Sequence, residues 1–115
     1  MSVRNLNIKI QLPVTEARVL RLTQSASIPR TMSVRHLNET GDTGPATVKW
    51  QESQDGVTFT DIAGTATVLN PGAGQSYLIT STSPFVALSG FGDVAIEVAV
   101  QRTDNDSPSE PQFAI

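Results

Sequence analysis

Residues 46–62 read ATVKWQESQDGVTFTDI, two runs of alternating apolar and polar side chains on either side of Asp55 and Gly56. An Asp-Gly pair between alternating runs is the strongest short-range signal of a β-hairpin, because both residues tolerate the positive φ of a tight turn. The sequence therefore predicts two antiparallel strands here. A loop with an even number of residues places Trp50 and Phe59 on the same face of the hairpin, and we expect these rings to pack together.

The same alternation recurs on both sides of the hairpin. In the segment 6–12 every second residue is apolar, and in 94–101 the aliphatic side chains share one face. A period of two is the pattern of a strand with one buried face. Clusters of turn-forming residues separate the runs and predict turns at 38–45, 71–74 and 90–93. The expected strands cover residues 6–12, 17–22, 31–37, 46–52, 57–62, 66–69, 75–80, 84–88 and 94–101.

Short strands at this spacing, with no helical pattern between them, are typical of a sandwich or a small barrel. We predict an all-β fold, a two-sheet antiparallel β-sandwich of jelly-roll or Ig-like type with about eight strands. Residues 1–102 form this domain. Residues 103–115, TDNDSPSEPQFAI, form an extended C-terminal arm, because such a composition cannot offset the entropy of folding. The arm ends in Phe113 and Ile115, so we expect it to be held along its own sandwich or on a neighbouring subunit.

The composition supports a single packed domain. The chain has 115 residues, of which 38% are hydrophobic and 17% charged, enough for one core without cross-links. It has no cysteine, which excludes disulfides, a thiol nucleophile and thiolate metal ligands. The first residues alternate instead of forming an apolar run, so we expect no secretion signal. No apolar stretch approaches the roughly 20 residues of a membrane helix, and we expect a soluble protein without a membrane partner.

The net charge of −3 is unevenly distributed. Residues 1–35 hold six basic residues and one acidic residue, whereas residues 36–115 hold two basic and ten acidic residues. An acidic chain is a poor ligand for nucleic acid, because Lys and Arg contacts to phosphate dominate that affinity. Two interpretations of the asymmetry stay open. Either the charges meet across strands within one molecule, or the molecule has a basic face and an acidic face suited to docking.

Candidate catalytic groups are few. His36 is the only histidine, and no G-x-S-x-G motif accompanies it, which disfavours a serine-histidine triad. One histidine and no cysteine would leave only carboxylates as further zinc ligands. A lone histidine in a strand is more often structural than catalytic, and we expect that role for His36.

Carboxylates offer two weaker hypotheses. Asp42 and the segment 104–106 supply oxygen ligands of the kind that calcium prefers, but their spacing matches no EF-hand loop. A glycoside hydrolase needs two carboxylates at a set separation, and the candidates would be Glu52, Asp55 and Asp61. The spacing in sequence does not test that separation. We predict that the protein is not an enzyme and has no catalytic residue, no cofactor and no metal.

Residues 48–64, VKWQESQDGVTFTDIAG, carry a more specific signal. They resemble the strand, S-x-D-G and T-W/F-T-D-I segment that recurs in small β-sandwich proteins of tailed-phage particles and in some carbohydrate-binding sandwiches. The segment is similar also to the Asp-box turn of sialidases, but one more residue normally separates the Asp from the Gly in that motif. The resemblance to phage proteins implies a structural role in a virion, most like that of a capsid decoration (cement) protein.

This resemblance implies a partner, a location and contact residues. A decoration protein binds the major capsid protein on the capsid exterior, after synthesis in the host cytoplasm, and stabilises the shell without catalysis. The implied hydrophobic anchors are Phe113 and Ile115, and the N-terminal segment around Arg4 is a second contact. Arg18 and Arg21 would complement an acidic capsid surface. Whether the protein forms a homo-oligomer is left open.

Two alternatives remain. A carbohydrate-binding module would use an exposed Trp50 or Tyr77 as a sugar platform beside the Asp55 turn. A tail or fibre domain would be another structural part of a virion. Trp50 alternates in phase with Val48, so we expect it to point inward, and sugar binding ranks second. The residues expected in the core include Trp50, Phe59, Ile96 and Val98.

Overall fold

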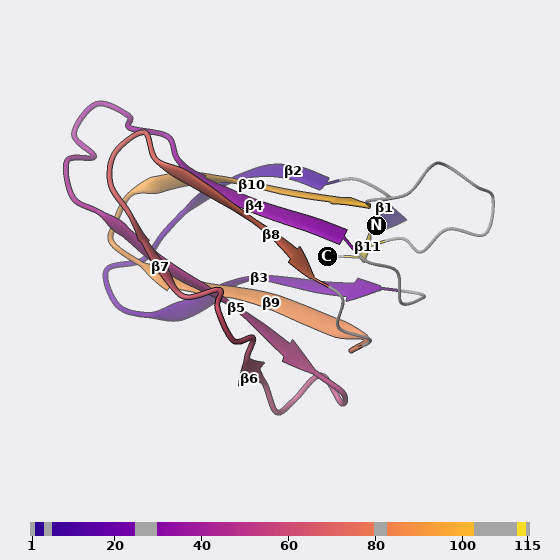
Figure 1. Ribbon diagram of the computed structural model, residues 1–115. Helices are drawn as coiled ribbons and strands as arrows, with labels where there is room; N and C mark the ends of the chain where they lie inside the picture. The colour runs from indigo at the N-terminus through magenta and orange to yellow at the C-terminus, as the bar shows by residue number, and fades with distance from the viewer. Residues whose placement is uncertain (1, 4–5, 25–29, 80–82, 103–112, 115) are drawn as a thin grey trace.

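A computed structural model describes residues 2–3, 6–24, 30–79, 83–102 and 113–114 of the chain. These residues contain strands, turns and loops, and they form no helix that could cross a membrane. The strands make two antiparallel sheets that pack face to face, which confirms the predicted sandwich (Figure 1). In chain order they are β1 (Ser2–Val3), β2 (Leu6–Gln11), β3 (Ala17–Gln24), β4 (Arg30–His36), β5 (Ala46–Ser53), β6 (Thr60–Asp61), β7 (Thr67–Leu69), β8 (Gly74–Ile79), β9 (Phe85–Phe91), β10 (Ala95–Arg102) and β11 (Phe113–Ala114).

The strand order is that of a jelly roll. One sheet, called sheet A, has the order β1-β11-β3-β9-β5-β6, and β7 also pairs with β5. The other, sheet B, has the order β2-β10-β4-β8. When the two-residue strands β1, β6 and β11 are left aside, the chain changes sheet at every connection except that between β5 and β7. Eight strands wound in this way form the two Greek keys of a jelly roll, which decides between the two sandwich types predicted.

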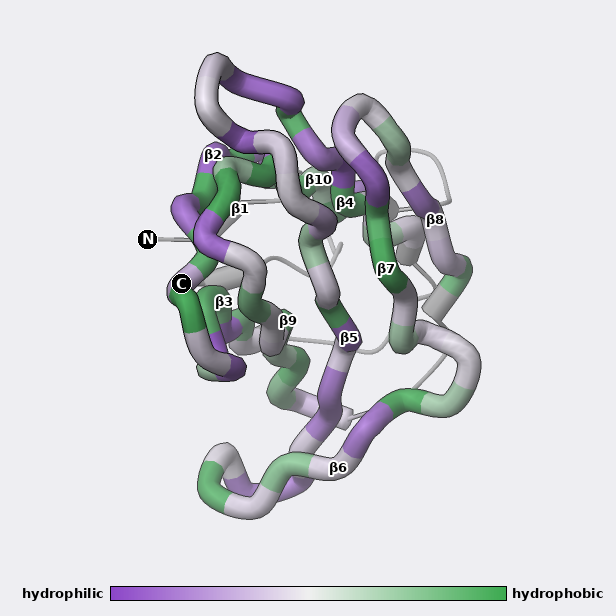
Figure 2. Tube along the Cα trace, turned by 90° about the vertical axis from the view of Figure 1, so that its left-hand side faces the viewer, coloured by the Kyte–Doolittle hydropathy of each residue, from purple (hydrophilic) through white to green (hydrophobic). Residues whose placement is uncertain are grey.

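Alternating side chains fill the space between the sheets. In β10, Ile96 and Val98 are fully buried, whereas Glu97 between them faces outward. Trp50 in β5 has no exposed surface, as its phase in the sequence predicts. Burial of a large aliphatic side chain stabilises a fold by about 1.5–3 kcal/mol. Hydrophobic and hydrophilic residues alternate along several of the strands (Figure 2).

The hairpin at 46–62 forms, but its register differs from the prediction. The Ile62 N–H donates a 2.9 Å hydrogen bond to the Trp50 carbonyl oxygen, so Ile62 lies opposite Trp50. Phe59 is half-buried and lies outside the core cluster, and the second strand, β6, covers only two residues. The expectation that Phe59 packs against Trp50 in the core is therefore wrong.

Side-chain hydrogen bonds in the turn explain this register. Ser53 Oγ accepts a hydrogen bond from the Gly56 N–H at 2.8 Å. Asp55 Oδ1 accepts from the N–H groups of Val57 at 2.8 Å and Thr58 at 2.9 Å. These backbone groups are satisfied locally instead of pairing with β5, so the loop is longer than that of a tight hairpin. The same hydrogen bonds, the one from Thr58 first, lower the pKa of Asp55 below its usual value.

The last turn also begins later than predicted. β9 continues through Gly90, and the turn residues with positive φ are Gly92 and Asp93. A Cβ at Gly90 would lie 2.8 Å from the Thr47 carbonyl oxygen. Gly90 therefore permits close packing of β9 on β5 rather than reversing the chain direction.

Both chain ends add a short strand to one edge of sheet A. The backbone of Phe113 lies opposite Gln24 of β3 and Val3 of β1, so β11 is inserted between β1 and β3. Residues 103–112 and 115 of the predicted arm lie outside the described residues.

Candidate interaction site

Arg18 and Arg21, which the sequence suggests as partner contacts, lie on the outer face of sheet A. Residues three apart in a regular strand face opposite sides of the sheet. A β-bulge between Arg18 and Leu20 shifts the register of β3 against β9, and this shift brings both arginines to one face. Both side chains are exposed there.

The two guanidinium groups pack on aromatic rings. The Arg18 guanidinium carbon lies 4.3 Å from the centre of the Phe59 ring. That of Arg21 lies 5.7 Å from the same ring and 5.3 Å from the centre of the Phe85 ring. Arg18 Nε also donates a 3.2 Å hydrogen bond to Gln51 Oε1. Cation–π contacts at exposed sites contribute about 0.5–1 kcal/mol each, so the arginines hold the 53–59 loop on the sheet.

The 53–59 loop closes over Arg21. Gly56 has a φ of +77°, and a Cβ at this position would lie 2.6 Å from an Arg21 guanidinium nitrogen and 3.1 Å from the Phe85 ring. Only glycine fits here without displacement of the arginine. The outcome is a pre-organised pair of cations, an arrangement suited to binding carboxylates of a partner.

The neighbouring lysine is already paired. Lys49 Nζ lies 3.3 Å from the Asp61 carboxylate and 3.6 Å from the Glu16 carboxylate. The hydrogen bond to Asp61 is the main cause that raises the pKa of Lys49, and a hydrogen bond from Gln51 is the main cause that lowers the pKa of Asp61. In the part of the chain that the structure describes, neither arginine forms an ion pair with a carboxylate, so their charges are available to a partner.

On sheet B the asymmetric charges meet across strands. Arg35 on β4 lies 3.4 Å from Glu97 on β10, and Glu97 is paired opposite Lys9 of β2. Lys9 also forms an ion pair with Glu39. These contacts join the basic N-terminal part to the acidic C-terminal part, as the first interpretation of the charge pattern predicts. Exposed pairs of this kind contribute only about 0–1 kcal/mol to stability.

His36 has the structural role that the sequence suggests. Its ring is buried, with Nε2 at 2.8 Å from the Gly44 carbonyl oxygen and Nδ1 accepting a 2.9 Å hydrogen bond from the Asn38 N–H. Because Nδ1 accepts, Nε2 carries the proton that is donated to Gly44. Asp42 Oδ2 accepts from the Ala95 N–H at 2.9 Å. Together these bonds hold the loop between β4 and β5.

The carboxylates considered for metal binding or hydrolysis are each engaged in separate contacts. Asp55 caps its own turn, and Asp61 forms an ion pair, as described above. Glu52 accepts a 2.6 Å hydrogen bond from the Ser83 hydroxyl. The calcium candidate 104–106 lies outside the described residues. Among the residues that are described, no group of three His, Cys, Asp or Glu side chains could hold a metal ion.

The aromatic residues considered as sugar platforms are not free to serve as one. Trp50 is fully buried, and its backbone N–H donates to Thr65 Oγ1 at 3.0 Å. Tyr77 is half-buried against the core, and its hydroxyl donates a 2.9 Å hydrogen bond to the Thr65 carbonyl oxygen. Burial raises the pKa of Tyr77. The geometry gives neither ring a wholly exposed face.

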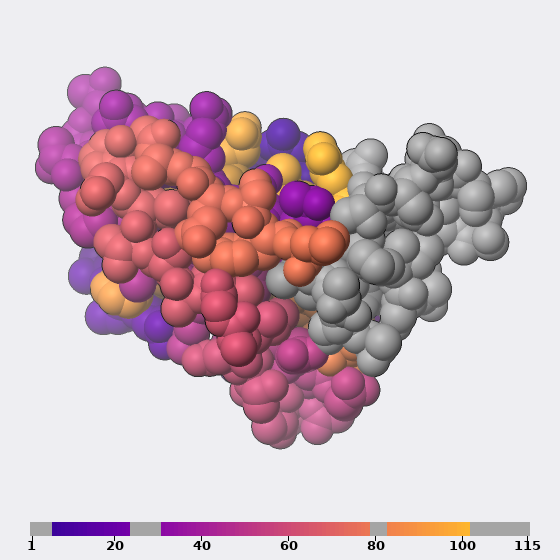
Figure 3. Space-filling view, viewed as in Figure 1, coloured from indigo at the N-terminus to yellow at the C-terminus, as the bar shows by residue number. Residues whose placement is uncertain are grey.

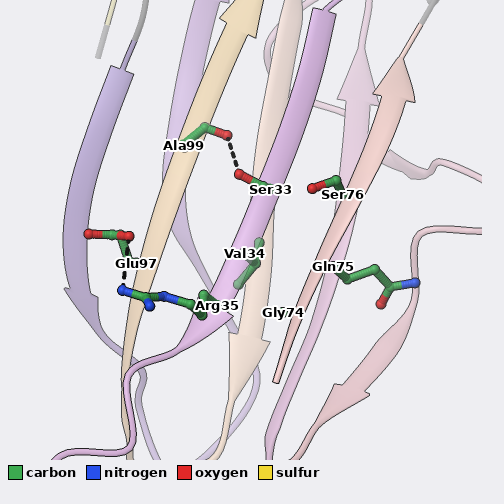
Figure 4. A pocket seen from close by; sticks show the side chains of 8 residues that line it. All are labelled: Ser33, Val34, Arg35, Gly74, Gln75, Ser76, Glu97 and Ala99. Atoms are coloured by element: carbon green, nitrogen blue, oxygen red, sulfur yellow. Dashed lines mark hydrogen bonds and ion pairs between the residues drawn. The ribbon is translucent and has the colours of Figure 1, made fainter. Parts of the chain in front are cut away.

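A shallow hollow of about 290 Å³ lies on the outer face of sheet B (Figure 4). The strand register places Ser33 between Ser76 and Ala99, so small side chains form its floor, and the pair of Arg35 and Glu97 lies at one end. Residues from three strands build it, and no local pattern in the sequence signals it. Its full lining is Ser33, Val34, Arg35, Gly74, Gln75, Ser76, Glu97 and Ala99.

The contact residues predicted near the chain ends are only partly described. The backbone of Phe113 pairs with β3, the strand that carries the two arginines. Arg4 and Ile115 lie outside the described residues. The sequence reasoning missed the part that Phe85 and Gly56 play beside Arg21. The Ser-x-Asp-Gly turn was the available signal, because its glycine marks a backbone that another group approaches closely.

The sequence matches one known protein family. Its residues 21–93, more than half of its length, match the family described as "Domain of unknown function (DUF8696)", and the chain belongs to this family. No curated protein matches the sequence.

Solved structures with a similar fold have little sequence in common with this chain. One is from Bacillus endospore appendages, described as a novel family of disulfide-linked pili, with a TM-score of 0.56 and 15% identity over 90% of this chain and 92% of that chain. Another is PirA, with a TM-score of 0.55 and 6% identity over 86% of this chain and 93% of that chain. At such identities the likeness shows the fold alone.

Proposed function

We propose that the protein is a non-catalytic structural protein that binds the outer surface of a virion shell, contacts the major capsid protein and stabilises the shell. The observation that carries this proposal is the meeting of both chain ends at β3, the strand that presents Arg18 and Arg21. Segments that the sequence marks as contacts, though far apart along the chain, thus converge on one edge of one sheet.

The arginine pair gives this edge its chemistry. Both cations are held by ring contacts before any partner arrives, so little side-chain entropy remains to be lost on binding. A fixed guanidinium binds a carboxylate through two parallel hydrogen bonds. The partner surface that fits is therefore acidic, with room for an extended terminal segment beside it.

Shell stabilisation would follow from many such contacts. A copy that binds the assembled shell, and not its separate subunits, stabilises the shell by mass action. Each contact can be modest, because identical contacts repeat over a closed surface. This mechanism requires no catalytic residue. The non-catalytic part of the proposal is supported by His36, Asp55 and Asp61, each of which is engaged in holding a loop or strand.

A tail or fibre component is the alternative within the same structural class, and the jelly-roll fold is compatible with it. Carbohydrate binding is the alternative of a different class. It has weaker support, because Trp50 is buried and Tyr77 is held by its hydroxyl group.

Co-sedimentation tests the proposal, using the purified protein and empty shells of the particle that encodes it. We expect the full chain to pellet with shells at a saturable ratio. A chain ending at Arg102, or one with both Arg18→Gln and Arg21→Gln, should pellet at least tenfold less. Arg35→Gln is the matched control, because it removes an exposed arginine from the other sheet. If the full chain does not pellet, or if Arg35→Gln is as defective as the double variant, the proposed contact is wrong.

A further inference from the structure

The edge strand β8 differs from the other sheet edges of the molecule. Edge strands invite pairing with other chains unless they are very short or carry charge or proline. In sheet A, the edge strands β1, β6 and β7 have only two or three residues. In sheet B, β2 carries Lys9. The strand β8, with the sequence GQSYLI, has six residues and none of these protections.

The surrounding sequence is also uncharged. Residues 62–92 contain no Asp, Glu, Lys, Arg or His, although this range includes the whole of β7, β8 and β9. Leu78 of β8 is 62% exposed, so this uncharged edge also carries a large aliphatic side chain on its surface. In the space-filling view, β8 runs along the face toward the viewer (Figure 3).

The backbone of β8 has hydrogen-bonding groups that point away from the sheet. The His36 N–H donates to the Ala73 carbonyl oxygen at 2.9 Å. Hydrogen-bonded and non-bonded pairs alternate along an antiparallel ladder. Counting from this pair, the N–H and C=O groups of Gly74, Ser76 and Leu78 point away from β4. Within the described residues, no other hydrogen bond uses them.

We propose that two copies of the chain associate through antiparallel pairing of β8 with β8, centred on Ser76. In this register Ser76 lies opposite Ser76 of the second copy, and Gly74 lies opposite Leu78 of the second copy. About six backbone hydrogen bonds would form, and the two four-stranded sheets would become one continuous sheet. The two-fold arrangement uses the same strand on both copies, so the contact is self-complementary and closed.

The hollow on sheet B favours a second copy over other partners. Leu78 and Gly74 share the outer face of the sheet with the hollow, and Gly74 lines it (Figure 4). In this register Leu78 of the second copy lies opposite Gly74, which has no side chain to obstruct it. Leu78 of the second copy would then cover the aliphatic part, or stem, of the Arg35 side chain. A Cβ at Gly74 would already lie 3.5 Å from Arg35 Cγ, so the stem is close to this position. An uncharged edge also meets its own copy without repulsion.

This inference goes beyond the proposed function, because it concerns contact between copies and does not require a shell. A contact confined to one strand edge buries a small area, so dimerisation should depend on protein concentration. Sedimentation equilibrium over a dilution series up to about 1 mM covers the range of weak specific complexes. We expect the mass to rise from 12.3 kDa toward twice that value.

Charge reversal at the two-fold axis provides the decisive variants. Ser76 is exposed and points away from the core, so Ser76→Lys and Ser76→Glu should fold, and circular dichroism checks this. Each variant alone should be monomeric, whereas an equimolar mixture should dimerise. Asn7→Lys is the matched control, because it adds the same charge to the same sheet at its other edge, and it should dimerise like the wild type.

Hydrogen exchange of the unaltered protein gives an independent readout. The amides of Gly74, Ser76 and Leu78 should exchange at least tenfold more slowly at high than at low protein concentration, while exposed loop amides stay unchanged. The proposal is overturned if the wild type remains monomeric at about 1 mM, if Ser76→Lys dimerises like the wild type, or if Asn7→Lys also dissociates. Unchanged exchange at these three amides in a protein that does dimerise would overturn it as well.

Discussion

Replacement of Gly90 by alanine adds one carbon where β9 packs on β5. That carbon would lie 2.8 Å from the Thr47 carbonyl oxygen, 2.9 Å from Val48 Cγ1 and 3.1 Å from Leu12 Cδ2. The oxygen belongs to the backbone of a central strand, so no side-chain rotation relieves the clash. Overpacking of this kind costs about 1–3 kcal/mol. At about 4 °C per kcal/mol for a domain of this size, we expect Tm to fall by roughly 4–12 °C.

Gly44→Ala is the matched control for this variant. A Cβ at Gly44 meets nothing within 4 Å, so its effect should stay below about 0.5 kcal/mol. Thermal unfolding followed by circular dichroism, together with urea titration at a common m value, measures both variants. If Gly90→Ala is as stable as Gly44→Ala, the close approach of β9 to β5 is refuted.

Three further predictions concern the loops. Phe59→Ala removes the ring beneath Arg18, so limited proteolysis should cut the 53–59 loop faster, and an unchanged rate would count against the ring contact. His36→Ala should lower the free energy of unfolding in urea by about 1–3 kcal/mol, because two buried hydrogen bonds are lost, and a loss below about 0.5 kcal/mol would contradict this. The pKa of Asp55 is lower in the folded chain than its ordinary value of 3.8, so its stabilising contribution is present above pH 3.8 and disappears as the pH falls through the folded value. As the pH is lowered from about 6 to about 2, the urea concentration at half-unfolding should therefore fall less steeply for Asp55→Asn than for the wild type. Equal slopes would refute the hydrogen bonds assigned to the Asp55 carboxylate in the turn.

The two proposed surfaces lie on opposite sides of the sandwich. The chain ends join sheet A beside β3. The strand β8 is an edge of sheet B, and a short loop connects it to β7, which lies at the other edge of sheet A. Pairing through β8 would therefore leave both terminal edges of a dimer uncovered. Such a dimer would contact its partner at two points, and linked contacts bind more strongly than separate ones.

Local patterns were sufficient for most of the strands. The segment 6–12 and the segment 94–101 alternate strictly, and the structure buries the predicted face of each. The inward direction of Trp50 followed from its phase with Val48. Turn residues likewise predicted the loop at 38–45. These features depend on the pleat of a single strand, which has a fixed period of two whatever its neighbours are.

The candidate sites could not be predicted in the same way. A bulge against β9 puts Arg18 and Arg21 on one face, although their spacing alone predicts opposite faces. The side-chain caps of the Asp55 turn bring Ile62, rather than Phe59, opposite Trp50. In both cases the hydrogen bonds made across strands or within the turn set the register.

Alternation and composition are enough to specify an all-β chain with two-faced strands, a single core and no cysteine chemistry. The jelly-roll winding, the meeting of the chain ends at β3, the hollow on sheet B and the position of β8 at an edge emerge only when the strands are paired in three dimensions. The physical reason is the range of the interactions. Side-chain periodicity is local, whereas strand order and register result from pairings between segments far apart in the chain, which no single segment encodes.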